Sequence, residues 1–135
     1  MIQRIQTVYL ILAFVFDGIV FFTPLYSHAM DDPQQWIGLG LAIILTCSAL
    51  MSLACIFLYS DRGNQIVWVK RTMYLQVTGL GWGVGILFSL GGIGTFLWDE
   101  LIGVGLLLLA LLAQILALRN IRKDEELVRS MDRIR

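Results

Sequence analysis

Four long runs of apolar residues, separated by short polar segments, make up most of the chain. They cover about residues 5–22, 37–58, 73–90 and 101–118, and each is close to the roughly 20 residues that a helix needs to cross the apolar core of a bilayer. The longest polar stretches, 59–71 and 119–135, are too short to bury a core of their own. The pattern predicts an all-α fold: an integral membrane four-helix bundle over residues 1–118, followed by an amphipathic cytoplasmic helix over residues 119–135.

The charged residues are divided unevenly among the polar segments. All ten Lys and Arg residues stand before the first run, between the second and third, or after the fourth. The other two loops carry Asp31, Asp32, Asp99 and Glu100 and no basic residue. Because positive charge stays on the cytoplasmic side of a membrane, both termini of this multi-pass chain are predicted to be cytoplasmic.

One carboxylate lies inside the first apolar run: Asp17, in "LAFVFDGIVFF". Every Lys and Arg is assigned to the cytoplasmic side, so none reaches it, and an unpaired charge in hydrocarbon is costly. The side chain is therefore expected to be neutral much of the time or to face water, with Thr46 and Ser89 as hydrogen-bond partners at similar depth. Two interpretations stay open: a proton-binding acid of a coupled transporter, or a neutral Asp that fixes the rotation of the helices.

The helical period of the first run places Asp17 on a polar and small-residue face. This face consists of Gln3, Gln6, Leu10, Ala13, Asp17 and Pro24, and Pro24 is expected to mark the outer end of the helix. In a membrane such a face turns toward neighbouring helices, because lipid receives the bulky apolar side chains.

Small residues predict close helix packing in the second and third runs. "GLGWGVG" carries Gly79, Gly81, Gly83 and Gly85, which form two overlapping pairs four residues apart, and such pairs let helix backbones approach one another. The second run has a comparable stripe that includes Ser48 and Ser52. The spacing leaves open whether the glycine contacts lie within one bundle or between chains. In the fourth run, Gln114 is expected to form an interhelical hydrogen bond.

The segment "RNIRKDEELVRSMDRIR" is predicted to be an amphipathic helix. Its apolar residues share one arc of a helical wheel, with charged residues opposite: Ile121, Leu127, Val128, Met131 and Ile134. Such a stripe either rests on the membrane surface or docks onto a cytoplasmic partner.

Catalytic chemistry is not expected. The single histidine, His28, lies in a short outer loop beside two acids, no cluster has the spacing of metal ligands, and no nucleophile has an evident base. We therefore expect no enzyme activity, no metal, no cofactor and no nucleic-acid partner. The expected partners are the lipid bilayer and either a larger membrane complex or further copies of the chain.

The two ends of the chain carry a resemblance to a known family. "MIQRIQTVYLILA" and "IRKDEELVRSMDRIR" resemble the DUF4293-like family of uncharacterised four-span inner-membrane proteins from Bacteroidetes, over the whole chain. The resemblance implies a bacterial inner-membrane location and a helical bundle, and it implies no reaction or substrate. Four spans with an acid in the first are also similar to the small multidrug resistance transporters, in architecture alone.

Two functional hypotheses follow. The first is a small structural or accessory subunit of an inner-membrane assembly, which engages a partner through its tail. The alternative is a proton-coupled small-molecule transporter or channel, formed by a homo-oligomer around Asp17.

Overall fold

The structure, a computed structural model, describes residues 2–31, 33–89 and 98–134. These residues form only helices, which confirms the all-α fold class. In chain order the elements are α1 (Ile2–Val20), α2 (Pro24–Asp31), α3 (Gln35–Phe57), the 3-10 turn η1 (Leu58–Ser60), α4 (Arg62–Ser89) and α5 (Trp98–Asp132).

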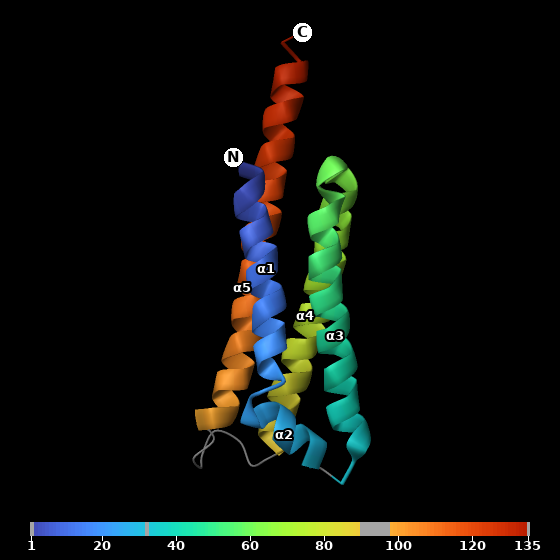
Figure 1. Ribbon diagram of the computed structural model, residues 1–135, viewed down its shortest axis with the longest axis vertical. Helices are drawn as coiled ribbons and strands as arrows, with labels where there is room; N and C mark the ends of the chain where they lie inside the picture. The colour runs from blue at the N-terminus through green and yellow to red at the C-terminus, as the bar shows by residue number, and fades with distance from the viewer. Residues whose placement is uncertain (1, 32, 90–97, 135) are drawn as a thin grey trace.

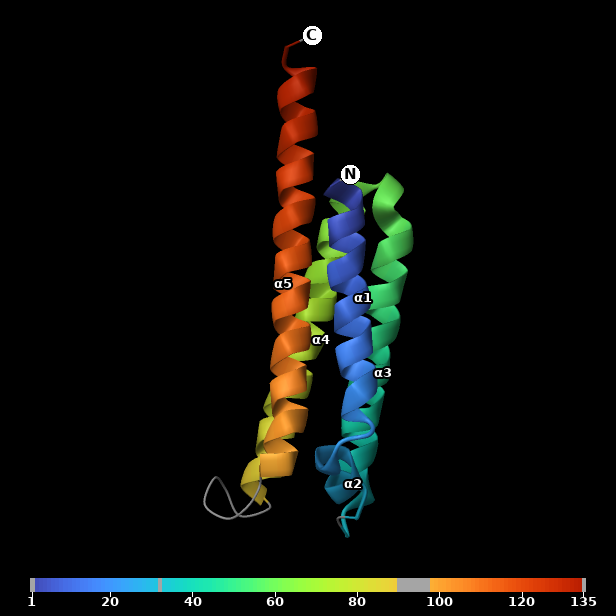
Figure 2. The same ribbon diagram turned by 60° about the vertical axis from the view of Figure 1, so that its left-hand side comes forward.

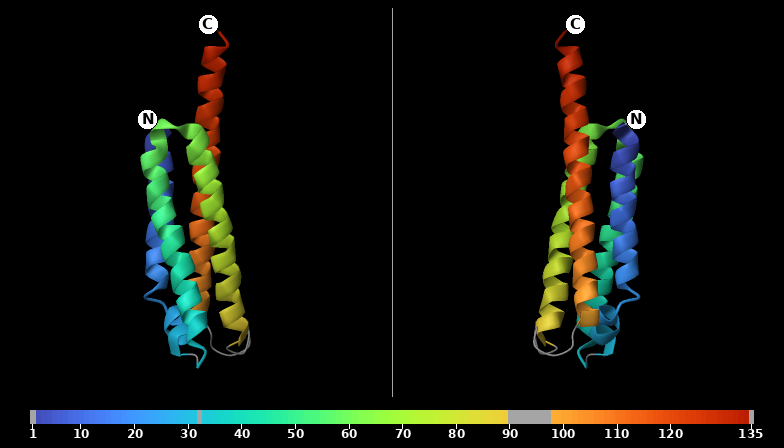
Figure 3. Two further views of the ribbon diagram at one scale, coloured as in Figure 1. Left: turned by 90° about the vertical axis from the view of Figure 1, so that its right-hand side faces the viewer. Right: turned by 90° about the vertical axis from the view of Figure 1, so that its left-hand side faces the viewer.

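Four long helices lie side by side, and one short helix crosses an end of the group. Helices α1, α3, α4 and α5 run along the long axis, and α2 lies across one end, next to the start of α3 (Figure 1). The start of α1 and η1 lie at the opposite end, and α5 extends past both of them (Figures 2 and 3). We call these the α2 end and the tail end.

Two of the described helices are long and apolar enough to cross a membrane: α3 with η1 (Gln35–Ser60) and α5 (Trp98–Asp132). A third candidate, Ile5–Val20 with Pro24–Asp31, meets the requirement only as a pair bent by 47°. Helix α4 has the length, but glycines and polar residues such as Gln76 dilute its apolar character. The long apolar helices indicate a membrane protein.

The first predicted span ends two residues earlier than expected, and a short helix follows it. Helix α1 ends at Val20, and α2 occupies part of what the sequence suggested to be a loop. Pro24 has no backbone N–H to donate, so it fits the first turn of a new helix better than the interior of α1. The Thr23 hydroxyl donates to the Val20 carbonyl over 2.6 Å and so occupies an acceptor at the end of α1.

Two glycines allow α2 to pack closely against α3 and α5. A Cβ on Gly38 of α3 would lie 2.7 Å from the Ala29 carbonyl oxygen, and a Cβ on Gly103 of α5 would lie 2.7 Å from the Leu25 Cβ. Both distances are shorter than real contacts of that kind. Only glycine lets α2 approach α3 and α5 this closely.

The fourth span and the tail form a single helix. We expected 101–118 and 119–135 as separate elements, but α5 runs through 35 residues without a break. No Gly or Pro stands between Leu118 and Asp132 to interrupt it. Similarly, α4 begins at Arg62 rather than near residue 73, and residue 90, the expected end of the third span, lies outside the described residues.

Buried apolar side chains gather in two separate clusters along the long axis. The α2-side cluster contains Val20, Leu25, Ala29, Leu41, Leu45, Ile86 and Leu107. The tail-side cluster contains Leu10, Cys55, Ile66, Val69, Ala117, Leu118 and Ile121. Each of the four long helices contributes to both clusters, and between the two lies a layer of buried polar residues.

Candidate functional site

Asp17 is fully buried and lies against α4. Its side chain has 0% exposure, and its Oδ1 accepts a hydrogen bond of 2.9 Å from the Gln76 side-chain nitrogen. The same nitrogen donates to the Leu107 backbone carbonyl over 3.2 Å. One carboxamide therefore joins α1, α4 and α5 at a single point.

Helix α3 completes this polar layer. The Ser48 hydroxyl donates to the Gln76 side-chain oxygen over 2.6 Å. The Gln114 nitrogen of α5 lies 3.4 Å from Ser48 Oγ, from Ser52 Oγ and from the Gln76 side-chain oxygen. All of these residues are buried. We call Asp17, Ser48, Ser52, Gln76 and Gln114 the polar cluster; each of the four long helices contributes at least one residue to it.

Two oxygens of the polar cluster have no hydrogen-bond partner within residues 2–31, 33–89 and 98–134. They are Asp17 Oδ2 and Gln114 Oε1, and both are buried. Buried acceptors in proteins are nearly always satisfied, so each exception requires an explanation. Two acceptors of the polar cluster, one of them on its carboxyl group, are therefore not satisfied by the described residues.

The surroundings separate the polar cluster from both ends of the molecule. In α1, Asp17 stands between Leu10 of the tail-side cluster and Val20 of the α2-side cluster. In α5, Gln114 stands between Leu107 and Ala117 in the same way. The polar cluster therefore lies between the α2-side cluster and the tail-side cluster along the long axis.

Only part of this site was predicted from the sequence. The inward face of α1 is confirmed at Gln6, Leu10, Ala13 and Asp17, which are all buried. Pro24 instead begins α2, and the side chain of Gln3 lies outside the described ones. The interhelical role of Gln114 is also confirmed. Gln76 was missed, although a glutamine in an apolar helix is the same kind of signal as Gln114.

The predicted partners of Asp17 are wrong. Thr46 is exposed, and its hydroxyl donates to the Ala42 carbonyl one turn earlier. Ser89 donates to the Ile86 carbonyl and lies at the far end of α4. Both hydroxyls donate to a backbone carbonyl of their own helix, as Ser and Thr commonly do. The prediction that Ser48 and Ser52 lie at a helix contact is correct, and they also serve as hydrogen-bonding groups of the polar cluster.

The four alternating glycines of α4 fall into two pairs with different surroundings. A Cβ on Gly83 would lie 2.9 Å from Leu107 Cδ1, and one on Gly79 would lie 3.1 Å from Ile44 Cγ2. For Gly81 and Gly85 nothing would lie within 4 Å. One pair therefore packs inside the chain, and the other faces open space.

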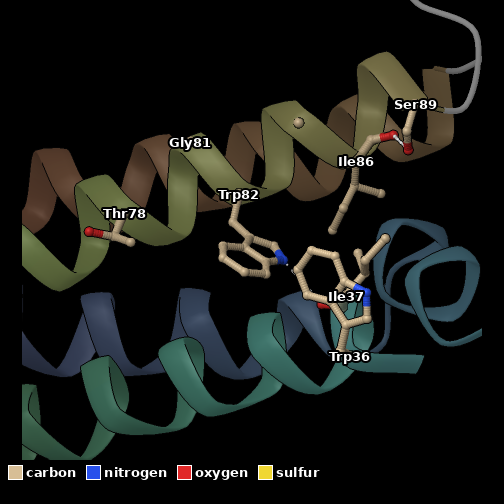
Figure 4. Close-up of a pocket in the computed structure, with 8 residues that line it drawn as sticks. Trp36, Ile37, Thr78, Gly81, Trp82, Ile86 and Ser89 are labelled. Atoms are coloured by element: carbon tan, nitrogen blue, oxygen red, sulfur yellow. Dashed lines mark hydrogen bonds between the residues drawn. The ribbon is translucent and has the colours of Figure 1, made fainter. Parts of the chain in front are cut away.

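Gly81 and Gly85 line a groove of about 470 Å³ between α3 and α4. Two tryptophans stand in it, Trp36 from α3 and Trp82 from α4 (Figure 4), with ring centroids 5.8 Å apart in an edge-to-face arrangement. The Trp82 nitrogen donates to the Ile37 carbonyl over 3.1 Å. Gly40 leaves room for the Trp82 ring, which would lie 2.7 Å from a Cβ at that position.

A polar contact links α2 to α5 at the α2 end. His28 Nε2 lies 3.1 Å from Glu100 Oε1, and the Glu100 side chain is buried while His28 is half-exposed. The other oxygen of Glu100 has no partner among the residues that the structure describes. In the described ranges, no three His, Cys, Asp or Glu side chains lie together in a way that could hold a metal ion.

The tail differs from the prediction at its first turns. Ile121, which we expected on the partner-facing stripe, is fully buried in the tail-side cluster. Asp124 is also buried, and its carboxylate accepts a hydrogen bond from the Gln6 side chain. The Arg62 guanidinium donates to the Asp124 carbonyl over 3.4 Å.

The remaining apolar side chains of the tail are exposed: Leu127, Val128, Met131 and Ile134. Because α5 continues straight along the long axis (Figure 2), its extension does not turn aside as a helix lying on a surface would. A groove beside it is lined by Tyr59, Ser60, Asp61, Arg62, Gly63, Glu125, Val128 and Arg129.

Comparison with known proteins gives one result. The model of a protein family described as a domain of unknown function, DUF4293, matches residues 2–134. No curated protein and no solved structure matches the chain.

Proposed function

For this chain, which belongs to the DUF4293 family, we propose a role as a small structural or accessory subunit of a bacterial inner-membrane assembly. In this proposal all four long helices cross the membrane, and both termini are cytoplasmic. The apolar extension of α5 engages the partner.

The charges support this topology. The basic residues lie near the start of α1, in the first part of α4 or after Leu118, and these segments lie together at the tail end (Figure 1). Helix α4 has 28 residues, which at 1.5 Å per residue is about 42 Å. A bilayer core is about 30 Å thick, so α4 is long enough to cross it despite its glycines.

The exposed end of α5 is the observation that carries the proposal. Leu127, Val128 and Met131 are 48%, 43% and 66% exposed. They lie near the end of α5, the helix that extends past the start of α1 and past η1 (Figure 2). Three large apolar side chains on one short helical segment in water favour association with another apolar surface. The fitting partner is an amphipathic helix of a larger subunit, on the cytoplasmic side of the same membrane.

The free glycine pair is consistent with a second contact inside the membrane. Gly81 and Gly85 are four residues apart on a face where a Cβ would meet none of the described residues, and such faces associate with other membrane helices. A transmembrane helix of the same partner fits the groove beside Trp36 and Trp82.

The test is the composition of the native complex, extracted mildly from its own membrane. Leu127, Val128 and Met131 are changed together to Ser, which should release a stoichiometric partner while the long helices stay folded. The matched control changes Lys123, Glu126 and Ser130 to Ala on the same exposed segment, and it should keep the partner. Retention of the partner by both variants would contradict docking through the apolar side.

A second candidate function rests on the polar cluster: proton-coupled transport of a small molecule, with Asp17 as the proton-binding acid. It is favoured by the unpartnered oxygen of Asp17 between two apolar layers. In this proposal a homo-oligomer forms the pathway around Asp17, which is held in each copy by its hydrogen bond to Gln76.

Flux measurements test the second candidate. In proteoliposomes Asp17→Asn should preserve folding and abolish proton-linked flux, whereas Thr46→Val, which changes an exposed hydroxyl on α3, should leave it unchanged. Flux that survives Asp17→Asn would remove Asp17 from the mechanism.

A further inference from the structure

The Gln76 nitrogen and the Ser48 hydroxyl have acceptors other than Asp17 Oδ2 and Gln114 Oε1. The Gln76 nitrogen serves Asp17 Oδ1 and the Leu107 carbonyl, and the Ser48 hydroxyl serves the Gln76 oxygen. Asp17 Oδ2 and Gln114 Oε1 are left without a donor. A buried acceptor without a donor keeps the full cost of its lost hydration.

The polar cluster also lacks a positive charge. Asp17 is its one titratable member; the side chains that face it from α3, α4 and α5 are hydroxyls and carboxamides, namely Ser48, Ser52, Gln76 and Gln114. The nearest buried acids along the axis, Glu100 and Asp124, lie beyond the apolar clusters and have their own partners. An ionised Asp17 would therefore be both uncompensated and short of a donor.

Gln114 is the member of the polar cluster best able to adjust. All three contacts of its nitrogen are 3.4 Å long, close to the limit of a hydrogen bond and longer than the favoured N–H···O distance. If this carboxamide rotates, only these weak hydrogen bonds are lost. Its free oxygen is the one neutral acceptor in the polar cluster that is without a donor.

We propose that Asp17 and Gln114 together form a proton-binding site. A hydronium ion of the solvent transfers its proton to Asp17 Oδ2: an O–H bond of hydronium breaks, leaving water, and an O–H bond forms on the carboxyl group, which becomes neutral. This new O–H donates to Gln114 Oε1. A single proton satisfies both unpartnered oxygens and removes the uncompensated charge. In the second candidate function, this site is where the proton binds before transport, so this part rests on that proposal. In a chain with a purely structural role, the same proton keeps the buried carboxyl group neutral.

Infrared difference spectroscopy on the full chain in lipid at pH 7 tests the site. The wild-type spectrum minus that of Asp17→Asn isolates the carboxyl group of Asp17. We expect a carboxylic-acid C=O band, which lies above the carboxylate bands in frequency. A difference spectrum that shows carboxylate bands instead would overturn the proposal.

Changing Gln114 tests the acceptor. In Gln114→Met, which keeps the length of the side chain and removes its oxygen, the Asp17 C=O band should shift in frequency because its O–H loses this partner. If Gln114→Met does not fold, Gln114→Asn draws the oxygen back by one methylene and should also shift the band. A band that stays in place in the folded variant would overturn the role of Gln114.

The infrared bands test the proton-binding site, and proton-linked flux tests the transport function independently. An acid band that responds to Gln114, in a chain without proton-linked flux, leaves the site standing and rejects only the transport function. A carboxylate spectrum rejects the site, whatever the flux.

Discussion

The side-chain nitrogen of Gln76 lies 2.9 Å from Oδ1 of Asp17, although the two residues are 59 positions apart in the sequence. This contact joins the first and the third of the four long helices at a depth where each of those helices contributes a polar side chain. The hydrogen bond gives one oxygen of the buried carboxyl group a donor and so lowers the cost of burying it.

Removing the Gln76 carboxamide should destabilise the packed helices. Gln76→Met keeps the bulk of the side chain but deletes its hydrogen bonds to Asp17, Leu107 and Ser48. We expect the free energy of unfolding in detergent to fall by about 1–3 kcal/mol, because buried polar groups lose their partners. Thr78→Val, which removes an exposed hydroxyl from the same helix, should change it by less than about 0.5 kcal/mol. Equal losses in both variants would contradict a special role for Gln76.

Glycine-to-alanine substitutions should separate packed glycines from free ones. Gly38→Ala would place a Cβ 2.7 Å from the Ala29 backbone oxygen, and we expect it to lower the free energy of unfolding by about 1–3 kcal/mol. Gly85→Ala meets nothing within 4 Å and should raise that free energy by up to ~1 kcal/mol, since alanine favours a helix. Thermal unfolding of the purified chain decides this. A loss of stability in Gly85→Ala would show that the groove is tighter than described.

The contact between His28 and Glu100 should hold α2 in place. In His28→Ala the buried Glu100 loses the partner that lies 3.1 Å away, and α2 should open more often. Because a partly exposed pair contributes at most about 1 kcal/mol, we expect amide hydrogen exchange in residues 24–31 to accelerate by no more than about five-fold. Ser27→Ala removes only a bond within α2 and is the control. Unchanged exchange in His28→Ala would mean that the glycine contacts alone hold α2.

The two ends of the tail stripe should respond differently to truncation of a side chain. Ile121→Ala removes a fully buried side chain from the tail-side cluster and should cost about 2–4 kcal/mol of unfolding free energy. Leu127→Ala changes an exposed side chain two turns later and should cost less than about 0.5 kcal/mol in the isolated chain. Similar losses in the two variants would place Leu127 in the packed part of the molecule.

The sequence by itself determined the helical character of the chain and the inward face of α1. Bulky apolar residues dominate the long runs, and the period of 3.6 residues puts Gln6, Leu10, Ala13 and Asp17 on one side of a helix. All four are buried. These features are local, because they depend on spacing within one segment, and so they can be read without knowing any neighbour.

Only the tertiary structure decided which residues meet. The partner of Asp17 is Gln76 rather than Thr46 or Ser89, because the depth of a residue depends on how far helices shift along one another, and no pattern within one helix records that shift. The position of the neighbouring helices also determines which glycines of α4 are covered: side chains of α3 and α5 contact Gly79 and Gly83 but not Gly81 and Gly85. It also places Ile121 in the tail-side cluster while Leu127 stays exposed: the apolar stripe is continuous in the sequence, but the other helices end partway along it.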